Sequence, residues 1–222
     1  MRLHEGISAA ALEELAQRCR WRRFDSGQRV ISREARDQDV YLIVSGRVRV
    51  TSFSASGRQV TYRDIPAGDW FGDFAAIDGR ARSADIVALE ATLVAAMDAA
   101  EFRRLLHEHP TVCDRMLRRL VASVRELTER VFDLSTLGVQ NRVHAEILRR
   151  ARQAGVNANS ARIDPAPKHT DIASQVSTYR EQVTRELSAM VKQGLVTRSG
   201  SALLIPDVAR LERIVAEVRR SP

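Results

Sequence analysis

A glycine, an arginine and a serine are spaced so that together they could hold one phosphate group. They lie in the segment 68–84, where Arg82 and Ser83 follow Gly72 by ten and eleven residues. Glycine permits a turn whose backbone N–H groups point outward, arginine supplies a bidentate cation, and serine supplies a hydroxyl. Asp73 would repel phosphate, but its carboxylate could accept a hydrogen bond from a ribose hydroxyl. The alternative is a glycine-rich turn in which Arg82 forms an ion pair with Asp73.

A second candidate site lies in the stretch 172–187, near the C-terminus. Its apolar residues are spaced for two short helices that meet at an angle, with Ser177 at the turn. Polar side chains that could reach DNA are expected near the start of the second helix: Thr178, Tyr179, Arg180, Glu181, Gln182 and Arg185. Arginine suits guanine O6 and N7, and glutamate can accept from cytosine N4. The alternative is an ordinary helical hairpin with a solvated, charged face.

The distribution of charge favours DNA as the partner of this second site. The formal net charge is +7, and residues 138–222 carry 14 Lys and Arg against 8 Asp and Glu. Basicity concentrated at one end of a chain is typical of a nucleic-acid-binding domain. The two cysteines provide neither a disulfide framework nor metal-ligand spacing, and no uncharged apolar run approaches 18 residues. We therefore expect a cytoplasmic protein that neither contacts a membrane nor requires a metal.

The phosphate segment lies within a part of the chain that predicts β-structure. From residue 19 to 97, short alternating segments are separated by glycine-containing turns, which indicates an antiparallel sandwich or barrel. A short helix is expected before them, over residues 8–18 with Ser8 as N-cap, and another after them, from Asp98 to about Pro110.

A long helix over residues 111–137 is predicted to link the two candidate sites. Its apolar residues recur at alternating steps of three and four: Leu117, Leu120, Val124, Leu127, Val131 and Leu134. A seam of this period indicates packing against a partner helix. The alternative is a long core helix of a single domain.

The C-terminal part predicts a helix–turn–helix followed by a hairpin. Helices are expected over 141–154, 169–175, 178–193 and 208–218, and strands over 195–198 and 202–205, while 156–167 is expected to be a loop with one short strand. The fold class is therefore α+β. We expect an N-terminal antiparallel β jelly roll (1–110), a dimerisation helix (111–137) and a C-terminal winged helix-turn-helix (138–222).

Two motifs resemble those of a known family. Phe71-Gly72-Asp73-x-Ala75, continued by Arg82-Ser83-Ala84, resembles the phosphate-binding cassette of cyclic-nucleotide-binding domains. The Arg-Glu-x-x-x-Arg pattern formed by Arg180, Glu181 and Arg185 completes a similarity to bacterial transcription regulators of the cAMP receptor protein/FNR superfamily. Three residues depart from the family pattern. Asp73 replaces the usual Glu, Ser177 a Gly, and Tyr179 a Ser.

The resemblance implies a regulator rather than an enzyme. It implies a cyclic nucleotide as allosteric ligand, cAMP being favoured over cGMP, bound by Gly72, Asp73, Phe74, Arg82 and Ser83, with Thr128 of the long helix meeting the base. It also implies a homodimer that binds double-stranded DNA with palindromic, TGTGA-like half-sites, and RNA polymerase as a further partner. Cys19 and Cys113 are too few for the iron–sulfur cluster of some relatives. Two alternatives stay open: a ligand-independent regulator with a degenerate pocket, and a nucleotide sensor that regulates a protein partner.

Overall fold

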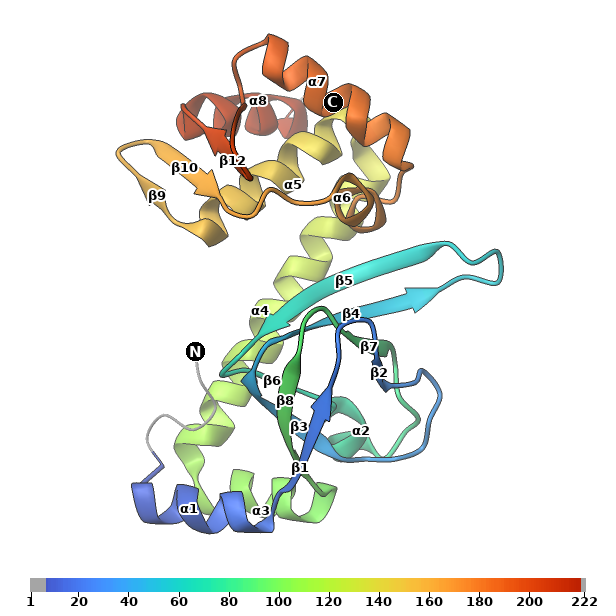
Figure 1. Cartoon of the computed structure of the whole chain (residues 1–222), viewed down its shortest axis with the longest axis vertical. Coiled ribbons are helices and arrows are strands. Elements are labelled where there is room, and N and C mark those ends of the chain that lie inside the picture. Colours follow the sequence, from blue (N-terminus) through green and yellow to red (C-terminus); the bar gives the residue numbers. More distant parts are fainter. Residues whose placement is uncertain (1–6, 221–222) are drawn as a thin grey trace. The chain divides into compact units, whose positions relative to one another are not determined.

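A computed structural model describes residues 7–220 of the chain. The chain divides into two compact units, residues 1–124 and 125–222, and each is described by itself (Figure 1). Among the described residues, no helix is long and apolar enough to cross a membrane.

Two four-stranded antiparallel sheets form the N-terminal unit, which confirms the expected β class. Their strand orders are β1-β8-β3-β6 and β2-β7-β4-β5. The strands are β1 (Arg20–Phe24), β2 (Arg29–Ile31), β3 (Val40–Ser45), β4 (Arg47–Phe53), β5 (Gln59–Pro66), β6 (Trp70–Phe71), β7 (Asp85–Ala88) and β8 (Thr92–Met97). Their inward-facing side chains form one buried core, which includes Ile43, Val48, Phe71 and Val94. The strand β6 was not predicted, because two buried residues are too few to show alternation.

Three short helices accompany the sheets: α1 (Ala9–Arg18), α2 (Asp73–Asp78) and α3 (Ala99–Glu108). The expected N-caps are confirmed, since Ser8 Oγ accepts a hydrogen bond from the amide of Ala11 at 3.2 Å and Asp98 Oδ1 from that of Glu101 at 2.8 Å. A second buried cluster, which includes Trp70, Phe102 and Met116, packs α3 and the first turns of the long helix against the strands.

The long helix α4 (Pro110–Thr136) begins in the N-terminal unit and ends in the C-terminal one. Most of its predicted seam is exposed: Leu117, Val124, Leu127, Val131 and Leu134 have exposed fractions between 44% and 63%. The prediction was wrong for Leu120, which packs against the core of the N-terminal unit. Val121 is 54% exposed and takes its place. It follows Leu117 by four residues and precedes Val124 by three, so the apolar stripe on the free face stays continuous.

The C-terminal unit has the order of a winged helix-turn-helix. Its elements are α5 (Val139–Ala154), β9 (Val156–Asn157), β10 (Ser160–Ile163), α6 (His169–Gln175), α7 (Arg180–Lys192), β11 (Thr197–Ser199), β12 (Ala202–Ile205) and α8 (Val208–Arg220). Where the sequence predicted one short strand, β9 and β10 form a hairpin that extends the β11–β12 pair into a four-stranded sheet. Val143, Ile172, Val183 and Leu211 are among the side chains that fill the core of this unit.

Candidate functional sites

The turn between β6 and α2 requires a glycine. Gly72 has a φ of +89°, in the left-handed region that other residues rarely adopt. A Cβ at this position would also lie 2.6 Å from the carbonyl oxygen of Asp39 and 2.9 Å from Nη1 of Arg82. Both the backbone conformation and the close approach of the Asp39 carbonyl therefore exclude a side chain at Gly72.

Arg82 is buried against this turn, with only 4% of its surface exposed. Its Nη1 donates to the carbonyl oxygen of Gly72 at 2.8 Å, and its Nη2 donates to that of Asp39 at 2.8 Å. The acidic partner of Arg82 is Asp37, in the loop before β3, rather than the Asp73 considered from the sequence. Nε of Arg82 is buried and has no hydrogen-bond partner among the described residues. The Nε–H of Arg82 is therefore available to a further acceptor oxygen.

Asp73 lies at the start of α2 and is buried beside an indole and a cation. Nε1 of Trp70 donates to its Oδ2 at 3.3 Å. The guanidinium of Arg119, on α4, stacks 3.8 Å from the centroid of the Trp70 ring. Nη1 of Arg119 also lies 2.8 Å from Oδ1 of Asp69, an ion pair without hydrogen-bond geometry. Burial, and then the charge of Arg63, lower the pKa of Arg119 to about 10.

A small cavity brings the predicted phosphate residues together. Gly72, Asp73, Phe74, Arg82 and Ser83 line it, with Arg63 of β5 and apolar side chains of both sheets. The Nε of Arg82, the exposed hydroxyl of Ser83 and the carboxylate of Asp73 are a donor and acceptor set that fits a cyclic phosphate beside a ribose. The cavity measures only about 70 Å³, whereas ligand pockets typically measure about 300–1,000 Å³. The cavity is therefore smaller than a typical pocket for a whole nucleotide.

Three residues that bear on this site were missed in the sequence. Asp37 and Arg63 come from segments well separated from the cassette, and Arg119 was one of many arginines on the long helix. Arg63 lines the cavity, and its Nη1 donates to Oγ of Ser123 on α4 at 3.2 Å. This hydrogen bond brings α4 close to the cassette. Thr128 is exposed on α4, belongs to the C-terminal unit and is not part of the cavity lining.

The turn of the helix-turn-helix is built on a strained serine. Ser177 has a φ of +54°, a left-handed conformation that costs a non-glycine residue about 1–2 kcal/mol. The amide of Thr178 donates to the carbonyl of Ala173 at 3.0 Å and closes the turn. Tyr179 is the N-cap, so α7 begins at Arg180 rather than at the predicted residue 178. The sequence could not show this delay, because both Thr178 and Tyr179 tolerate helical conformations.

The polar residues predicted to contact DNA lie at the start of α7. Tyr179, Arg180, Glu181 and Arg185 are exposed, while Val183, Leu187 and Met190 on the opposite face are buried. Nη2 of Arg185 is hydrogen-bonded to Oε1 of Gln182, and Nε2 of Gln182 donates to Glu186 at 2.9 Å. The first two turns of α7 therefore present two guanidinium groups and one carboxylate, which could donate to guanine and accept from cytosine.

His169, at the start of α6, is a further residue beside this surface. Its Nδ1 lies 2.7 Å from the hydroxyl oxygen of Thr184, and that hydroxyl donates to the carbonyl of Arg180 at 3.0 Å. The Thr184 oxygen must then accept from Nδ1–H. In the neutral imidazole, Nε2 is therefore the ring nitrogen without a proton. Burial, and then the charges of Arg198 and Arg180, hold the pKa of His169 below its ordinary value. This contact was not predicted, because a single histidine at the start of a short helix forms no recognisable sequence pattern.

Comparisons with known proteins identify both domains. Residues 21–109 match the model of the cyclic nucleotide-binding domain, and residues 141–214 match that of the Crp-like helix-turn-helix domain. The chain is 24% identical over 212 residues, 95% of each protein, to the CRP-like cAMP-activated global transcriptional regulator of Mycobacterium tuberculosis. It is 28% identical over 179 residues to the cyclic AMP receptor protein of Thermus thermophilus, covering 80% of this chain and 79% of that protein.

The fold has a match among solved structures. A CooA mutant from Carboxydothermus hydrogenoformans superposes with a TM-score of 0.81, covering 91% of this chain and 90% of that one at 21% identity. At that identity the similarity shows the fold alone. The two domain matches, in this order and joined by one long helix, show that the chain belongs to the cAMP receptor protein/FNR superfamily of transcription regulators.

Proposed function

We propose that the chain is a homodimeric transcription regulator whose DNA binding responds to a cyclic nucleotide, cAMP in preference to cGMP. The observation that carries the nucleotide part is the buried Nε of Arg82, which has no hydrogen-bond partner among the described residues and belongs to a side chain that lines a cavity together with Ser83 and Asp73. A cyclic phosphate oxygen would satisfy that donor. The carboxylate of Asp73 would accept a hydrogen bond from the ribose hydroxyl. Its side chain is one methylene shorter than that of glutamate.

The preference for cAMP rests on two supports. The similar proteins of M. tuberculosis and T. thermophilus are named for cAMP. In the proposed dimer, Thr128 would meet the purine, because it follows the exposed seam residue Leu127 on α4. Without the hydroxyl of Thr128, the edge of the purine would lack a hydrogen-bond partner on α4.

The exposed seam of α4 supports the homodimer. A continuous stripe of apolar side chains on one long helix is typical of a helix that packs against a second copy of itself. The proposal assigns residues 1–110 to nucleotide binding, 111–137 to dimerisation and 138–222 to DNA. Nucleotide bound to the cassette and the paired helices would favour the arrangement in which both α7 helices enter successive major grooves. RNA polymerase would then meet the protein on DNA, in the cytoplasm.

Two measurements test this function. Calorimetric titration with cAMP and cGMP separately should show binding, tighter for cAMP. Selection from random DNA, with and without the nucleotide, should recover a palindrome with TGTGA-like half-sites about one helical turn apart.

A variant tests the DNA-reading residues. Arg180→Ala should weaken the free energy of binding to that site by about 1–3 kcal/mol and relax the preference at one base pair. Recovery of a non-palindromic site would contradict the DNA assignment.

A second candidate function is a ligand-independent regulator of the same superfamily. The cavity volume of about 70 Å³ favours it, because the cassette would then serve only the packing of the N-terminal unit. In that case DNA binding would be equal with and without nucleotide, and neither titration would release heat.

A further inference from the structure

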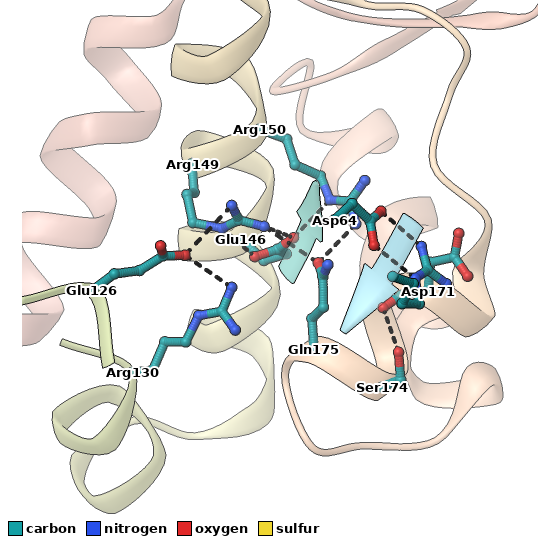
Figure 2. Close-up of polar contacts among 10 residues, drawn as sticks. Asp64, Glu126, Arg130, Glu146, Arg149, Arg150, Asp171, Ser174 and Gln175 are labelled. Carbon is teal, nitrogen blue, oxygen red and sulfur yellow. Dashed lines mark hydrogen bonds and ion pairs between the residues drawn. The ribbon is translucent and has the colours of Figure 1, made fainter. Parts of the chain in front are cut away.

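A network of charged side chains surrounds Glu146 in the C-terminal unit (Figure 2). Glu146 lies on α5 and is buried. Its carboxylate accepts from Nε and Nη2 of Arg149 at 2.8 and 2.7 Å, and from Nε of Arg150 at 2.6 Å. Burial acts to raise the pKa of Glu146, but the hydrogen bonds and charges of Arg149 and Arg150 outweigh it and hold the pKa below its ordinary value. An ionised carboxylate therefore fixes two arginines on one face of α5.

Both arginines reach the end of α6, immediately before the helix-turn-helix turn. Oε1 of Gln175, the last residue of α6, accepts from Nη2 of Arg150 at 2.7 Å and from Nη2 of Arg149 at 3.4 Å. Arg142, also on α5, donates from Nε to the carbonyl of Val176 at 3.0 Å. The strained Ser177 follows directly. The side chains of α5 thus hold the last two residues before the turn that presents α7.

The same network also reaches the long helix α4. Oε1 of Glu126 lies 3.8 Å from Nη1 of Arg149 and 3.1 Å from Nη2 of Arg130. Burial, and then the charge of Arg149, lower the pKa of Arg130. Glu126 therefore lies between two cations that repel each other. Arg149 is shared between α4 through Glu126 and the end of α6 through Gln175.

A cavity beside the network gives Arg149 room to move. It measures about 330 Å³ and its lining includes Glu126, Arg130, Glu146, Arg149 and Gln175. The contact of Arg149 with Glu126 is long at 3.8 Å, whereas its contacts with Glu146 are short. Since a packed interior would hold the guanidinium in one place, this space leaves Arg149 room to change its contacts.

We infer that Glu146 and Gln175 are positioning residues for the recognition helix α7, and that Arg149 and Glu126 connect them to α4. This rests on the proposed function, because it names the residues by which a change in α4 would reach the DNA-reading turn. A shift of α4 would move Glu126, redistribute the contacts of Arg149, and loosen or tighten the end of α6. A coupling of this kind needs an element with two arrangements that both sites can bias.

Amide hydrogen exchange on the full-length protein tests the inference without DNA or nucleotide. Gln175→Leu removes the shared acceptor, and Glu126→Gln weakens the link to α4. Both should speed exchange at residues 176–178, by about 2- to 30-fold for the coupling expected of such a residue. The amide of Thr178, bonded to Ala173 at 3.0 Å, is the reporter. The strand β12 is the internal reference.

Two controls separate positioning from general loosening. Glu129→Gln makes the same charge change at an exposed residue of the same helix that lines the same cavity but has no ion pair with Arg149 among the described residues, and it should leave residues 176–178 unchanged. Gln175→Glu keeps an acceptor for both arginines and should retain the protection that Gln175→Leu loses. Equal exchange in Glu126→Gln and Glu129→Gln would overturn the inference, and so would equal acceleration in β12.

Binding to the DNA site that the wild-type protein selects gives the second readout. Glu126→Gln should reduce the ratio of dissociation constants without and with cyclic nucleotide by about 2- to 30-fold, and Glu129→Gln should not. An unchanged ratio in Glu126→Gln would overturn the connection to α4. A wild-type protein that selects no DNA would instead contradict the proposed function, and the exchange measurement would still decide the positioning roles.

Discussion

At the scale of single residues, Arg82 has both a structural and a proposed ligand-binding role. Its two terminal nitrogens hold the carbonyls of Gly72 and Asp39, and its Nε is left for an acceptor. Arg82→Ala should therefore lower cyclic-nucleotide affinity at least tenfold, because a hydrogen bond to a charged group is worth about 1.5–3 kcal/mol. Calorimetric titration measures the loss.

Two further variants separate the two roles of Arg82. Ser83→Ala, at an exposed residue, should weaken affinity about fivefold by the loss of one hydrogen bond of about 1 kcal/mol, without disturbing the fold. Arg80→Ala removes an exposed arginine of the same segment and should change nothing. Wild-type affinity in both Arg82→Ala and Ser83→Ala would show that the cassette does not bind nucleotide.

How far the sequence could predict the site depends on how local each contact is. Gly72, Asp73, Arg82 and Ser83 lie within one short segment, so their spacing alone predicts that they act together. Asp37 meets Arg82 only because the loop before β3 folds back onto the cassette. Pairings between residues far apart in the chain follow from the packing of the whole unit, which local patterns do not encode.

His144 should make the stability of the C-terminal unit depend on pH. It is buried on α5, its Nδ1 has no hydrogen-bond partner among the described residues, and burial lowers its pKa. The folded state then binds its proton less readily than the unfolded state, whose pKa is about 6.5. The stabilising contribution of His144 is complete above that pH and is lost as the pH falls below it.

Urea unfolding followed by circular dichroism from about pH 7.5 to pH 5 measures this effect. The wild-type midpoint should fall with pH, and His144→Gln should flatten that fall. His107→Gln, at an exposed histidine in the other unit, serves as control. An identical pH profile in His144→Gln and the wild type would contradict the assignment.

At the scale of elements, turn residues and periodicity predicted most of the strands and helices. The elements that escaped prediction, β6 and β9, are two residues long and exist because a neighbouring strand pairs with them. The seam of α4 was predicted in period but wrong at Leu120. The period alone cannot tell whether Leu120 or the adjacent Val121 packs against the core of the N-terminal unit.

The exposed seam of α4 leads to a prediction about assembly. Val121→Asp together with Leu127→Asp would place charges in the desolvated centre of the proposed dimer interface, where each costs several kcal/mol. Light scattering should therefore show monomers with an unchanged circular dichroism spectrum, since both side chains are exposed within the chain. Val156→Asp, an exposed valine outside the seam, should remain dimeric. A wild-type protein that is monomeric at micromolar concentration would refute the helix pairing.

At the scale of the whole molecule, each unit has a buried core of its own. We therefore expect two calorimetric transitions, and a ligand held by the cassette to displace mainly the transition of the N-terminal unit. Cyclic nucleotide at about 100 times its dissociation constant should stabilise the N-terminal unit by about 2.7 kcal/mol, which raises its transition by roughly 10 °C. Arg82→Ala should abolish that shift. An unchanged transition of the N-terminal unit would contradict the assignment of the cassette as the nucleotide site.

In the proposed regulator, the ion pair between Arg82 and Asp37 would set the response threshold. Asp37 is half-exposed in a loop, and its carboxylate would compete with a bound phosphate for the charge of Arg82. Asp37→Asn should therefore tighten nucleotide affinity by about two- to fivefold, the value of an ion pair of up to about 1 kcal/mol. A residue outside the cassette would thus set the concentration at which the regulator responds, and substitutions there could retune its sensitivity while leaving the choice of nucleotide unchanged.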